Sequence, residues 1–302
     1  MLDEYVIGVH NRQSPEADIP IIDKSSVEYR LGGAANVALN LQALDLNPML
    51  ISINGDDEHG RKLTALCKSH IKETHIIKIE GHQTTTKTRI VDPSFKQWLR
   101  IDSERIEDVS KDHLQIVLLK LKELLISSEV DAIIIQDYNK GLITVECIKA
   151  VTSLAEALKV PIFVDPKRNN FLELSESEVF KPNLKELEWA WGQAIEPSVS
   201  SLSLAISELG LKSKQIYVTL AEKGIFYLDQ TSGLKGIIEG TEIEKPDVSG
   251  AGDTVMAALV FSYLNGASTK QMAQLANKAG YLVCLKKGVS TVSKTEIEAK
   301  NL

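Results

Sequence analysis

The stretch Asp247-Val248-Ser249-Gly250-Ala251-Gly252-Asp253-Thr254 is followed directly by an apolar run, Val255 to Leu264, made of good helix formers. The Gly-Ala-Gly-Asp segment therefore lies where a loop becomes a buried helix. The first N–H groups of a helix have no internal partners, and the helix dipole is positive at that end. We therefore predict that the backbone at Gly250, Ala251 and Gly252 holds an anion such as a phosphate.

The carboxylate of Asp253 needs a separate explanation, because it would repel a phosphate. One interpretation is that Asp253 is a general base, which accepts the proton of an attacking hydroxyl. The other is that Asp253 only caps the helix while the glycines turn the chain, since Asp is among the best N-cap residues. A base beside an anion site indicates phosphoryl transfer.

The composition sets wide limits on the function. The 302 residues are enough for one large α/β domain or two small ones. The net charge of −7 gives no overall basic field for nucleic acid or an anionic membrane surface. Cys67, Cys147 and Cys284 lie far apart, which argues against a disulfide framework or a zinc site. No apolar run approaches the roughly 20 residues of a membrane span, so we expect a cytoplasmic protein.

A second glycine-rich segment occurs near the start of the chain. Leu31-Gly32-Gly33-Ala34-Ala35-Asn36 opens a helix that is expected to run through Leu44. Paired glycines allow a ligand to approach the backbone closely, and the Asn36 amide can both donate to and accept from hydroxyls. The alternative is a tight packing turn with no ligand.

Charged side chains alternate in two expected strands. In Thr84 to Val91, Lys87 and Arg89 fall on one face, and Arg100 and Asp102 share a face of the following strand. These residues belong either to a solvated hairpin with ordinary surface charge or to a small sheet that covers a phosphorylated ligand. In the second case Lys87, Arg89 and Arg100 would contact the ligand.

From Lys111 onward, helices and apolar strands alternate. We expect helices at 111–126, 145–158 and 201–209, strands at 132–135, 160–164 and 216–220, and a final helix at 270–285. Repeated strand-helix units with apolar strands predict a mostly parallel sheet covered by helices on both faces.

Polar residues follow the ends of these strands. Asp137, Asp165 and Thr219 are candidates for one cleft, because ligands of open α/β sheets bind at the carboxyl ends of strands. Asn183 and Glu186 could hold Mg²⁺ directly or through waters. The P-loop and dinucleotide-binding glycine motifs are absent from the sequence, so the anion site must be the late one.

With these residues assembled, the chain resembles the ribokinase-like (PfkB) carbohydrate kinases over nearly its whole length. Gly32 to Asn36 resembles the family's amino-terminal signature and Asp247 to Thr254 its carboxy-terminal signature. The resemblance implies a single doubly wound α/β domain over 1–302, with a small β-sheet lid drawn from about 5–31 and 84–103. It also implies that ATP and Mg²⁺ are used, and that Asp253 deprotonates the sugar hydroxyl that attacks the γ-phosphate of ATP.

Within the family, the chain is most similar to the heptose-7-phosphate kinases of lipopolysaccharide core (ADP-heptose) synthesis. The stretches that carry this similarity are Met1 to Tyr5, Ser14 to Ala17, Gly32 to Ala38, Lys87 to Arg89, Leu99 to Asp102, Asp137 to Gly141, Val164 to Lys167 and Lys181 to Glu186. It implies transfer of phosphate from ATP to the anomeric hydroxyl of D-glycero-D-manno-heptose 7-phosphate, which gives the 1,7-bisphosphate.

The resemblance also implies roles for individual residues. The sugar phosphate would be bound by Asp3, Gly32, Gly33, Asn36, Lys87, Arg89, Arg100, Asp137 and Lys140. The nucleotide would be bound by Asp165, Lys167, Asn183, Lys185, Glu186, Thr219, Glu222, Gly224 and Asn277, with Glu186 acting on Mg²⁺ through water. Relatives often pair through their lids, so a homodimer is expected.

Three features depart from the family pattern. Relatives have an apolar strand directly before the segment matched by Met1-Leu2-Asp3, so we expect either that this inner strand lies upstream of Met1 or that the sheet lacks it. Ala221 stands where the nucleotide loop commonly has Gly. Some relatives carry a nucleotidyltransferase domain after the kinase, and none is expected here, because the sequence ends at Leu302. Kinases of other sugars, and a binding protein without turnover, are the alternative functions.

Overall fold

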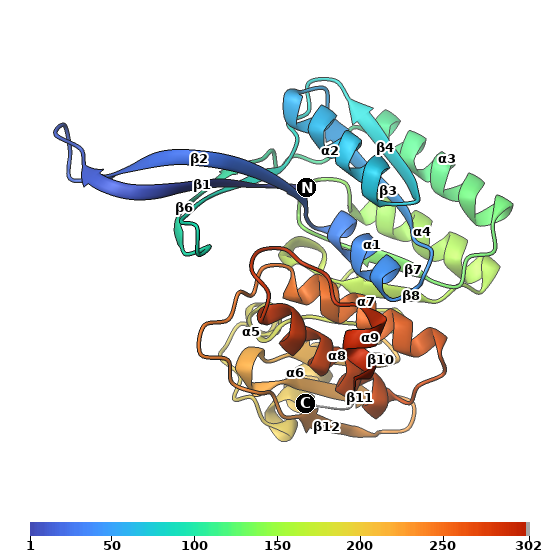
Figure 1. Ribbon diagram of the computed structural model, residues 1–302. Coiled ribbons are helices and arrows are strands. Elements are labelled where there is room, and N and C mark those ends of the chain that lie inside the picture. The colour runs from blue at the N-terminus through green and yellow to red at the C-terminus, as the bar shows by residue number, and fades with distance from the viewer. Residues whose placement is uncertain (300–302) are drawn as a thin grey trace.

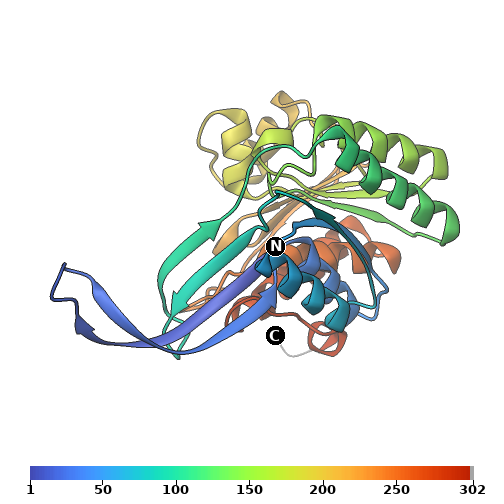
Figure 2. The same ribbon diagram turned by 90° about the horizontal axis from the view of Figure 1, so that it is seen from above.

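A four-stranded sheet forms the part of the molecule that was expected to be a lid. The computed structural model describes residues 1–299. The strands are β1 (Leu2–Gln13), β2 (Pro20–Leu31), β5 (Thr86–Val91) and β6 (Gln97–Ser103), in the order β2-β1-β5-β6. β1 is antiparallel to β2 and parallel to β5. The far ends of β1 and β2 extend as an arm beyond the body of the protein (Figures 1 and 2).

The main sheet has six strands in the order β12-β11-β10-β9-β8-β7. They are β7 (Ile133–Gln136), β8 (Ile162–Asp165), β9 (Val179–Phe180), β10 (Gln215–Thr219), β11 (Ile225–Asp229) and β12 (Lys235–Ile238). β7 to β10 are parallel, as predicted, whereas β11 and β12 add an antiparallel edge that the sequence analysis did not foresee. Three of the five strand pairings are parallel, so the prediction of a mostly parallel sheet is confirmed.

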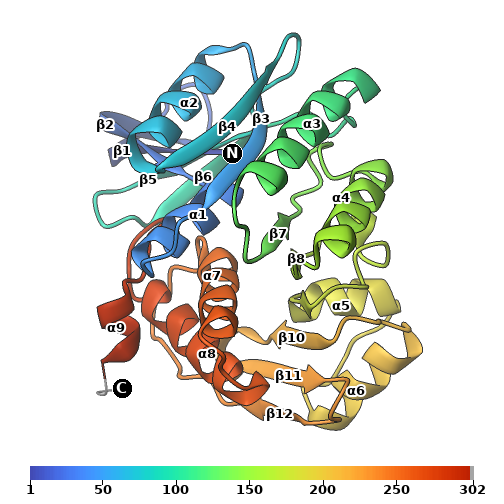
Figure 3. The same cartoon turned by 90° about the vertical axis from the view of Figure 1, so that its right-hand side faces the viewer.

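Helices cover both faces of this sheet (Figure 3). One apolar cluster joins the sheet to α1 (Ala34–Ala43), α7 (Ala251–Leu264) and α8 (Thr269–Cys284). The other joins it to α3 (Lys111–Ser127), α4 (Val145–Leu158), α5 (Leu184–Trp191) and α6 (Val199–Glu208). In β10, Tyr217 packs in the first cluster, and Ile216 and Val218 pack in the second. This alternation confirms the doubly wound α/β prediction.

The most deeply buried helix is α7. Its residues from Val255 to Val260 are all buried, as is typical of a helix that is apolar on every side. The prediction that 270–285 is the last helix is wrong, because α9 (Lys294–Glu298) follows α8. A capping box between Ser293 and Glu296 starts α9, and Ile297 buries its apolar side. Within residues 1–299, no helix is both long and apolar enough to cross a membrane.

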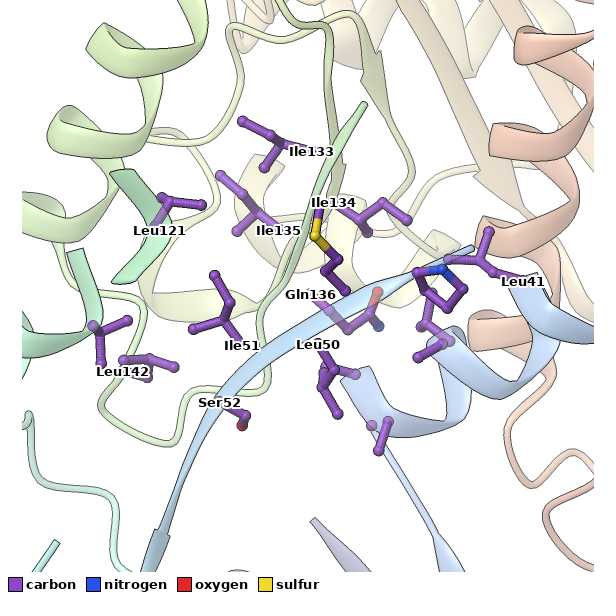
Figure 4. Close-up of a pocket in the computed structure, with 18 of the residues that line it drawn as sticks. Leu41, Leu50, Ile51, Ser52, Leu121, Ile133, Ile134, Ile135, Gln136 and Leu142 are labelled. Carbon is purple, nitrogen blue, oxygen red and sulfur yellow. The ribbon is translucent and has the colours of Figure 1, made fainter. Parts of the chain in front are cut away.

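The strands β3 (Met49–Gly55) and β4 (Glu73–Ile79), which flank α2 (Glu58–His70), form a separate two-stranded sheet. A cavity of about 550 Å³, lined largely by apolar side chains, lies between β3 and β7 (Figure 4). The N–H groups of Ile133 and Asp137 donate to the Pro161 and Asp165 carbonyls, on the side of β7 that faces β8. The backbone groups of Ile134 and Gln136 therefore point away from β8, to the side of the cavity. The cavity thus separates the two-stranded sheet from the six-stranded sheet.

Candidate active site

The start of α7 has the geometry of an anion site. Gly250 is the N-cap residue, with a φ of 79° that favours glycine. A Cβ on Gly250 would lie 2.6 Å from Nδ2 of Asn36, so glycine also lets α1 approach. Among the described residues, no side chain caps α7, which leaves the N–H groups of Gly252 and Asp253 for a ligand. The Ala251 N–H instead donates to the Val248 carbonyl at 3.2 Å, so the prediction that it holds the anion is wrong for this structure. Because Gly250 is the N-cap, the interpretation of Asp253 as the helix cap is wrong.

Asp253 is buried, with 4% of its surface exposed, and three side chains donate hydrogen bonds to it. Its Oδ2 accepts from Asn36 Nδ2 at 2.8 Å, and its Oδ1 accepts from Tyr138 OH at 2.6 Å and from Gln136 Nε2 at 3.2 Å. Burial raises the pKa of Asp253 to about 6, although the bonds from Tyr138 and Asn36 oppose this shift. A carboxylate with such a pKa suits a general base near neutral pH.

Asp165, at the end of β8, lies beside Asp253. Gln136 Nε2 bridges the two carboxylates, since it also donates to Asp165 Oδ2 at 2.7 Å. Lys181 Nζ lies 3.1 Å from the same Asp165 oxygen. The other oxygen, Oδ1, is buried and has no hydrogen-bond partner among the described residues.

The Asp137 N–H donates to the Asp165 carbonyl at 3.1 Å, but the Asp137 carboxylate makes no hydrogen bond to Asp165 or Asp253. Its carboxylate accepts from the Asn139 N–H at 2.7 Å and from Asn170 Nδ2 at 3.0 Å. Burial raises the pKa of Asp137 and these bonds partly oppose the shift. In the structure, Asp137 therefore holds its own loop in place.

Asn183 and Glu186 form a reciprocal capping box at the start of α5. Asn183 Oδ1 accepts from the Glu186 N–H at 2.9 Å, and Glu186 Oε2 accepts from the Asn183 N–H at 2.8 Å. Glu186 Oε1 is ion-paired with Lys167. Burial lowers the pKa of Lys167, but the carboxylates of Asp165 and Glu186 raise it above its ordinary value. The neighbouring Lys185 is exposed.

The other residues expected to bind nucleotide gather around the end of β10 and the segment after β12. Thr219 forms a β-bridge with Asn183, which connects this region to the capping box. Gly224 packs so closely on the backbone of Ile238 that a Cβ would overlap it, and Asn277 Nδ2 donates to the Glu239 carbonyl at 2.9 Å. Glu222 lies exposed in the turn between β10 and β11. These residues are thus brought together.

Two residues expected to bind sugar form a buried ion pair at the base of the lid. Asp3 on β1 and Arg89 on β5 are paired, and both are largely buried. A Cβ at Gly32 would overlap the Asp3 carboxylate, which explains the need for glycine there. Gly33 is adjacent and faces the ring of Tyr138. Asp3, Gly32, Gly33 and Arg89 therefore form one group.

The three other basic residues that were expected to bind the sugar phosphate already have acidic partners. Lys87 Nζ lies 3.1 Å from Asp102 Oδ2, and Arg100 Nε lies 2.8 Å from Asp102 Oδ1. The register pairs Lys87 with Asp102 and Arg89 with Arg100, as the predicted faces require. Lys140 Nζ lies 2.8 Å from Glu104 Oε2. The basic character of this cluster is weaker than its lysines and arginines alone indicated.

Sequence reasoning gave no role to Gln136, Tyr138 or Lys181, which all lie beside the two carboxylates. Tyr138 and Lys181 occur in stretches that carry the family resemblance. Gln136 had a weaker signal, because it is the polar residue that ends the apolar run of β7.

Comparisons with known proteins show the family to which the chain belongs. Residues 5–296 match the pfkB family of carbohydrate kinases. The chain is 37% identical over 302 residues to the bifunctional protein HldE of Hyphomonas neptunium, and 35% identical over 301 residues to that of Actinobacillus succinogenes. These matches cover 99% of this chain but 61% of each relative, so the chain spans about three fifths of the relatives' length.

Solved structures show the same fold. Escherichia coli phosphofructokinase-2, in complex with substrates and products, matches with a TM-score of 0.81 at 18% identity, covering 98% of this chain and 94% of that one. Arabidopsis thaliana ribokinase, complexed with ribose and ATP, matches with a TM-score of 0.71 at 20% identity, with the same coverage. The fold is therefore ribokinase-like. Because the family match spans nearly the whole sequence, the chain belongs to the pfkB family of carbohydrate kinases and is a phosphotransferase that acts on a sugar.

Proposed function

We propose that this kinase transfers the γ-phosphate of ATP to the anomeric hydroxyl of D-glycero-D-manno-heptose 7-phosphate. The observation that carries the chemistry is the buried carboxylate of Asp253, with a pKa of about 6, in the first turn of α7. An anion site and a base with a suitable pKa occur together there, as direct phosphoryl transfer requires. The product would be the 1,7-bisphosphate, an intermediate of ADP-heptose and lipopolysaccharide core synthesis.

The choice of heptose 7-phosphate rests on similarity. The stretches that resemble heptose-7-phosphate kinases extend along most of the chain, and the curated relatives named HldE are 34–37% identical. A sugar phosphate is also consistent with Lys87, Arg100 and Lys140, which come from the lid and from the loop after β7. Phosphate binding would require Asp102 and Glu104 to share these cations or release them.

The positions of the remaining residues support a proposed role for each. Asn36 would orient both Asp253 and the sugar hydroxyl, since its amide already contacts the base. The free N–H groups at the start of α7 would receive the phosphoryl oxygens that carry charge during transfer. Lys167 and Lys181 supply positive charge next to Asp165. The nucleotide would extend from there toward Thr219, Gly224 and Asn277.

The residues present fit a magnesium ion. Asp165 Oδ1 is a buried carboxylate oxygen that accepts no hydrogen bond from the described residues, with Lys167 Nζ 4.0 Å away. Mg²⁺ in kinases is commonly held by one or two carboxylates together with substrate phosphates and waters. Glu186 is less available, since Asn183 and Lys167 occupy its oxygens, so it would act through water. The ion would neutralise charge on the phosphates. Asp165 would be the main protein ligand, because its Oδ1 accepts no hydrogen bond from the described residues. Residues 1–299 contain no cluster of three or more acidic, His or Cys ligands.

We also propose that the kinase is a cytoplasmic homodimer that pairs through the lid. Its three cysteines are free, which fits a reducing compartment. The outer strand β6 exposes Leu99 and Ile101, each to about half of their surface. Replacing both by Asp should convert a dimer to a monomer in sedimentation velocity, whereas a wild-type monomer would exclude the pairing.

A coupled ADP-release assay with Mg-ATP tests the proposed reaction. Heptose 7-phosphate, fructose 6-phosphate, ribose and a reaction without sugar would be compared. We expect strong release only with heptose 7-phosphate, and a loss of on the order of a hundredfold or more for Asp253→Asn, whose amide cannot take up the proton. ADP release with another sugar would support kinase activity but identify a different substrate. Full activity of Asp253→Asn would show that Asp253 is not the base.

A further inference from the structure

The residues around Tyr138 hold its side chain against Asp253. It follows β7 in the stretch Asp137 to Gly141, and its hydroxyl donates to Asp253 Oδ1 at 2.6 Å. One side of the ring faces Gly33, where a Cβ would lie 3.3 Å from the Tyr138 ring. Lys167 Nζ lies 5.7 Å from the ring centroid. The phenol is thus held between α1 and the loop after β8, and a larger residue at position 33 would displace it.

The two oxygens of Asp253 are not equivalent. An ionised carboxylate has about four acceptor positions, two on each oxygen. Both positions of Oδ1 are filled, one by Tyr138 OH and one by Gln136 Nε2. Oδ2 accepts only from Asn36 Nδ2 among the described residues, so one position stays open. That open position is where an incoming hydroxyl can deliver its proton.

We propose that Tyr138 is the positioning residue of the catalytic base: its hydroxyl holds Oδ1 of Asp253 in the ionised form, so that Oδ2 accepts the proton of the sugar hydroxyl. This inference rests on the proposed role of Asp253 in the kinase reaction. A hydrogen bond to the charged form of a carboxylate favours that form, so loss of the Tyr138 hydroxyl shifts Asp253 toward protonation.

Other charged groups also surround Asp253. Asp165 on β8 raises its pKa, and Lys181, which follows β9, lowers it. Lys167 and the amino group of Met1 are close enough to interact with the same carboxylate. A Tyr138→Phe substitution changes none of these charges and removes a single oxygen atom. The change in the pKa of Asp253 then reports the phenol hydrogen bond.

The test is a ¹³C NMR titration of protein labelled at the Asp carboxyl carbons, without sugar or nucleotide. The Asp253 signal is identified by its disappearance in Asp253→Asn. We expect the pKa of Asp253 to rise from about 6 in the wild type by about one unit or more in Tyr138→Phe. Tyr227→Phe is the matched control, because Tyr227 is also buried but lies on β11. It should leave the Asp253 signal unchanged.

A second substitution moves the pKa the other way. Placing 3-fluorotyrosine at position 138 makes the phenol a stronger donor, so the pKa of Asp253 should fall below the wild-type value. In kinase assays, Tyr138→Phe should reduce kcat/KM about fivefold at pH 6 and hardly at all at pH 9, if the shift is about one unit.

An unchanged Asp253 pKa in both variants would overturn the proposal. Because the titration needs no turnover, it is independent of the sugar substrate. Conversely, a shifted pKa together with full activity of Asp253→Asn would leave the hydrogen bond in place and refute the kinase role of the base.

Discussion

The ionisation of Asp253 controls how the proposed reaction depends on pH. Burial raises the pKa of this carboxyl to about 6, and only the ionised form can accept a proton. kcat/KM should therefore be low below pH 5, rise tenfold per pH unit there, reach half of its maximum near pH 6 and level off above pH 7. The measurement is kcat/KM from pH 5 to 9 with the productive sugar phosphate. A flat profile between pH 5 and 7 would contradict the assignment.

Side chains differ in how well the sequence predicted their roles. Asp253 and Gly250 were identifiable because one short segment contains the base, the turn and the helix start. The pair between Asp3 and Arg89 could not be deduced, since it depends on the pairing of β1 with β5 across more than eighty residues of sequence. Gln136 was missed for a similar reason, because its partners lie on β8 and α7.

At the level of secondary-structure elements, the lid strands β5 and β6 are predicted to bind the phosphate of the sugar. Lys87→Ala should raise KM for the sugar phosphate by about tenfold or more. The substitution removes a charge-assisted contact to the phosphate and leaves the negative charge of Asp102 without its Lys87 partner. KM for ATP should change by less than about twofold, since the nucleotide residues lie elsewhere.

The matched control for this substitution is Lys96→Ala. Lys96 also belongs to the lid, at the turn before β6, and its Nζ lies 5.1 Å from the Trp98 ring centroid. Lys96→Ala therefore removes one positive charge, as Lys87→Ala does, but leaves the ion pairs of Asp102 intact. Equal losses of affinity for sugar phosphate and ATP in Lys87→Ala would refute the lid assignment.

The alternating strands and helices after Lys111 were predictable because their apolar runs are long and regular. β11 and β12 were missed, although the run Ile225 to Leu228 and the polar turn after it are signals of a hairpin. The nucleotide loop shows a different limit. Ala221 has a φ of 54°, a left-handed conformation unusual for a residue other than glycine. The departure from the family's Gly was visible in the sequence, but the conformation needed the structure.

The described residues leave a large space unfilled inside the molecule. The cavity between β3 and β7 has an apolar lining and a strand edge on each side. Met1 lines it, and burial lowers the pKa of the Met1 amino group. A strand of about six Val and Ile residues fused ahead of Met1 should therefore enter the cavity, pair with both edges and raise the melting temperature by several degrees.

This prediction can be checked by thermal unfolding together with binding of the dye ANS, which reports exposed apolar surface. A six-residue Gly-Ser extension is the control, because it adds length without apolar side chains. The Val-Ile extension should bind less dye and unfold at a higher temperature than the control. Equal melting temperatures for the two extensions would show that the cavity does not accept a strand.

The position of the transferred phosphate tests the whole arrangement of lid, base and helix terminus. Heptose 7-phosphate and Mg-ATP would be incubated with the wild type and with Asp253→Asn, and the products followed by ³¹P NMR. We predict a new phosphate signal coupled to the anomeric proton for the wild type and almost none for the variant. A phosphate on another hydroxyl, or equal product from the variant, would contradict the proposed reaction.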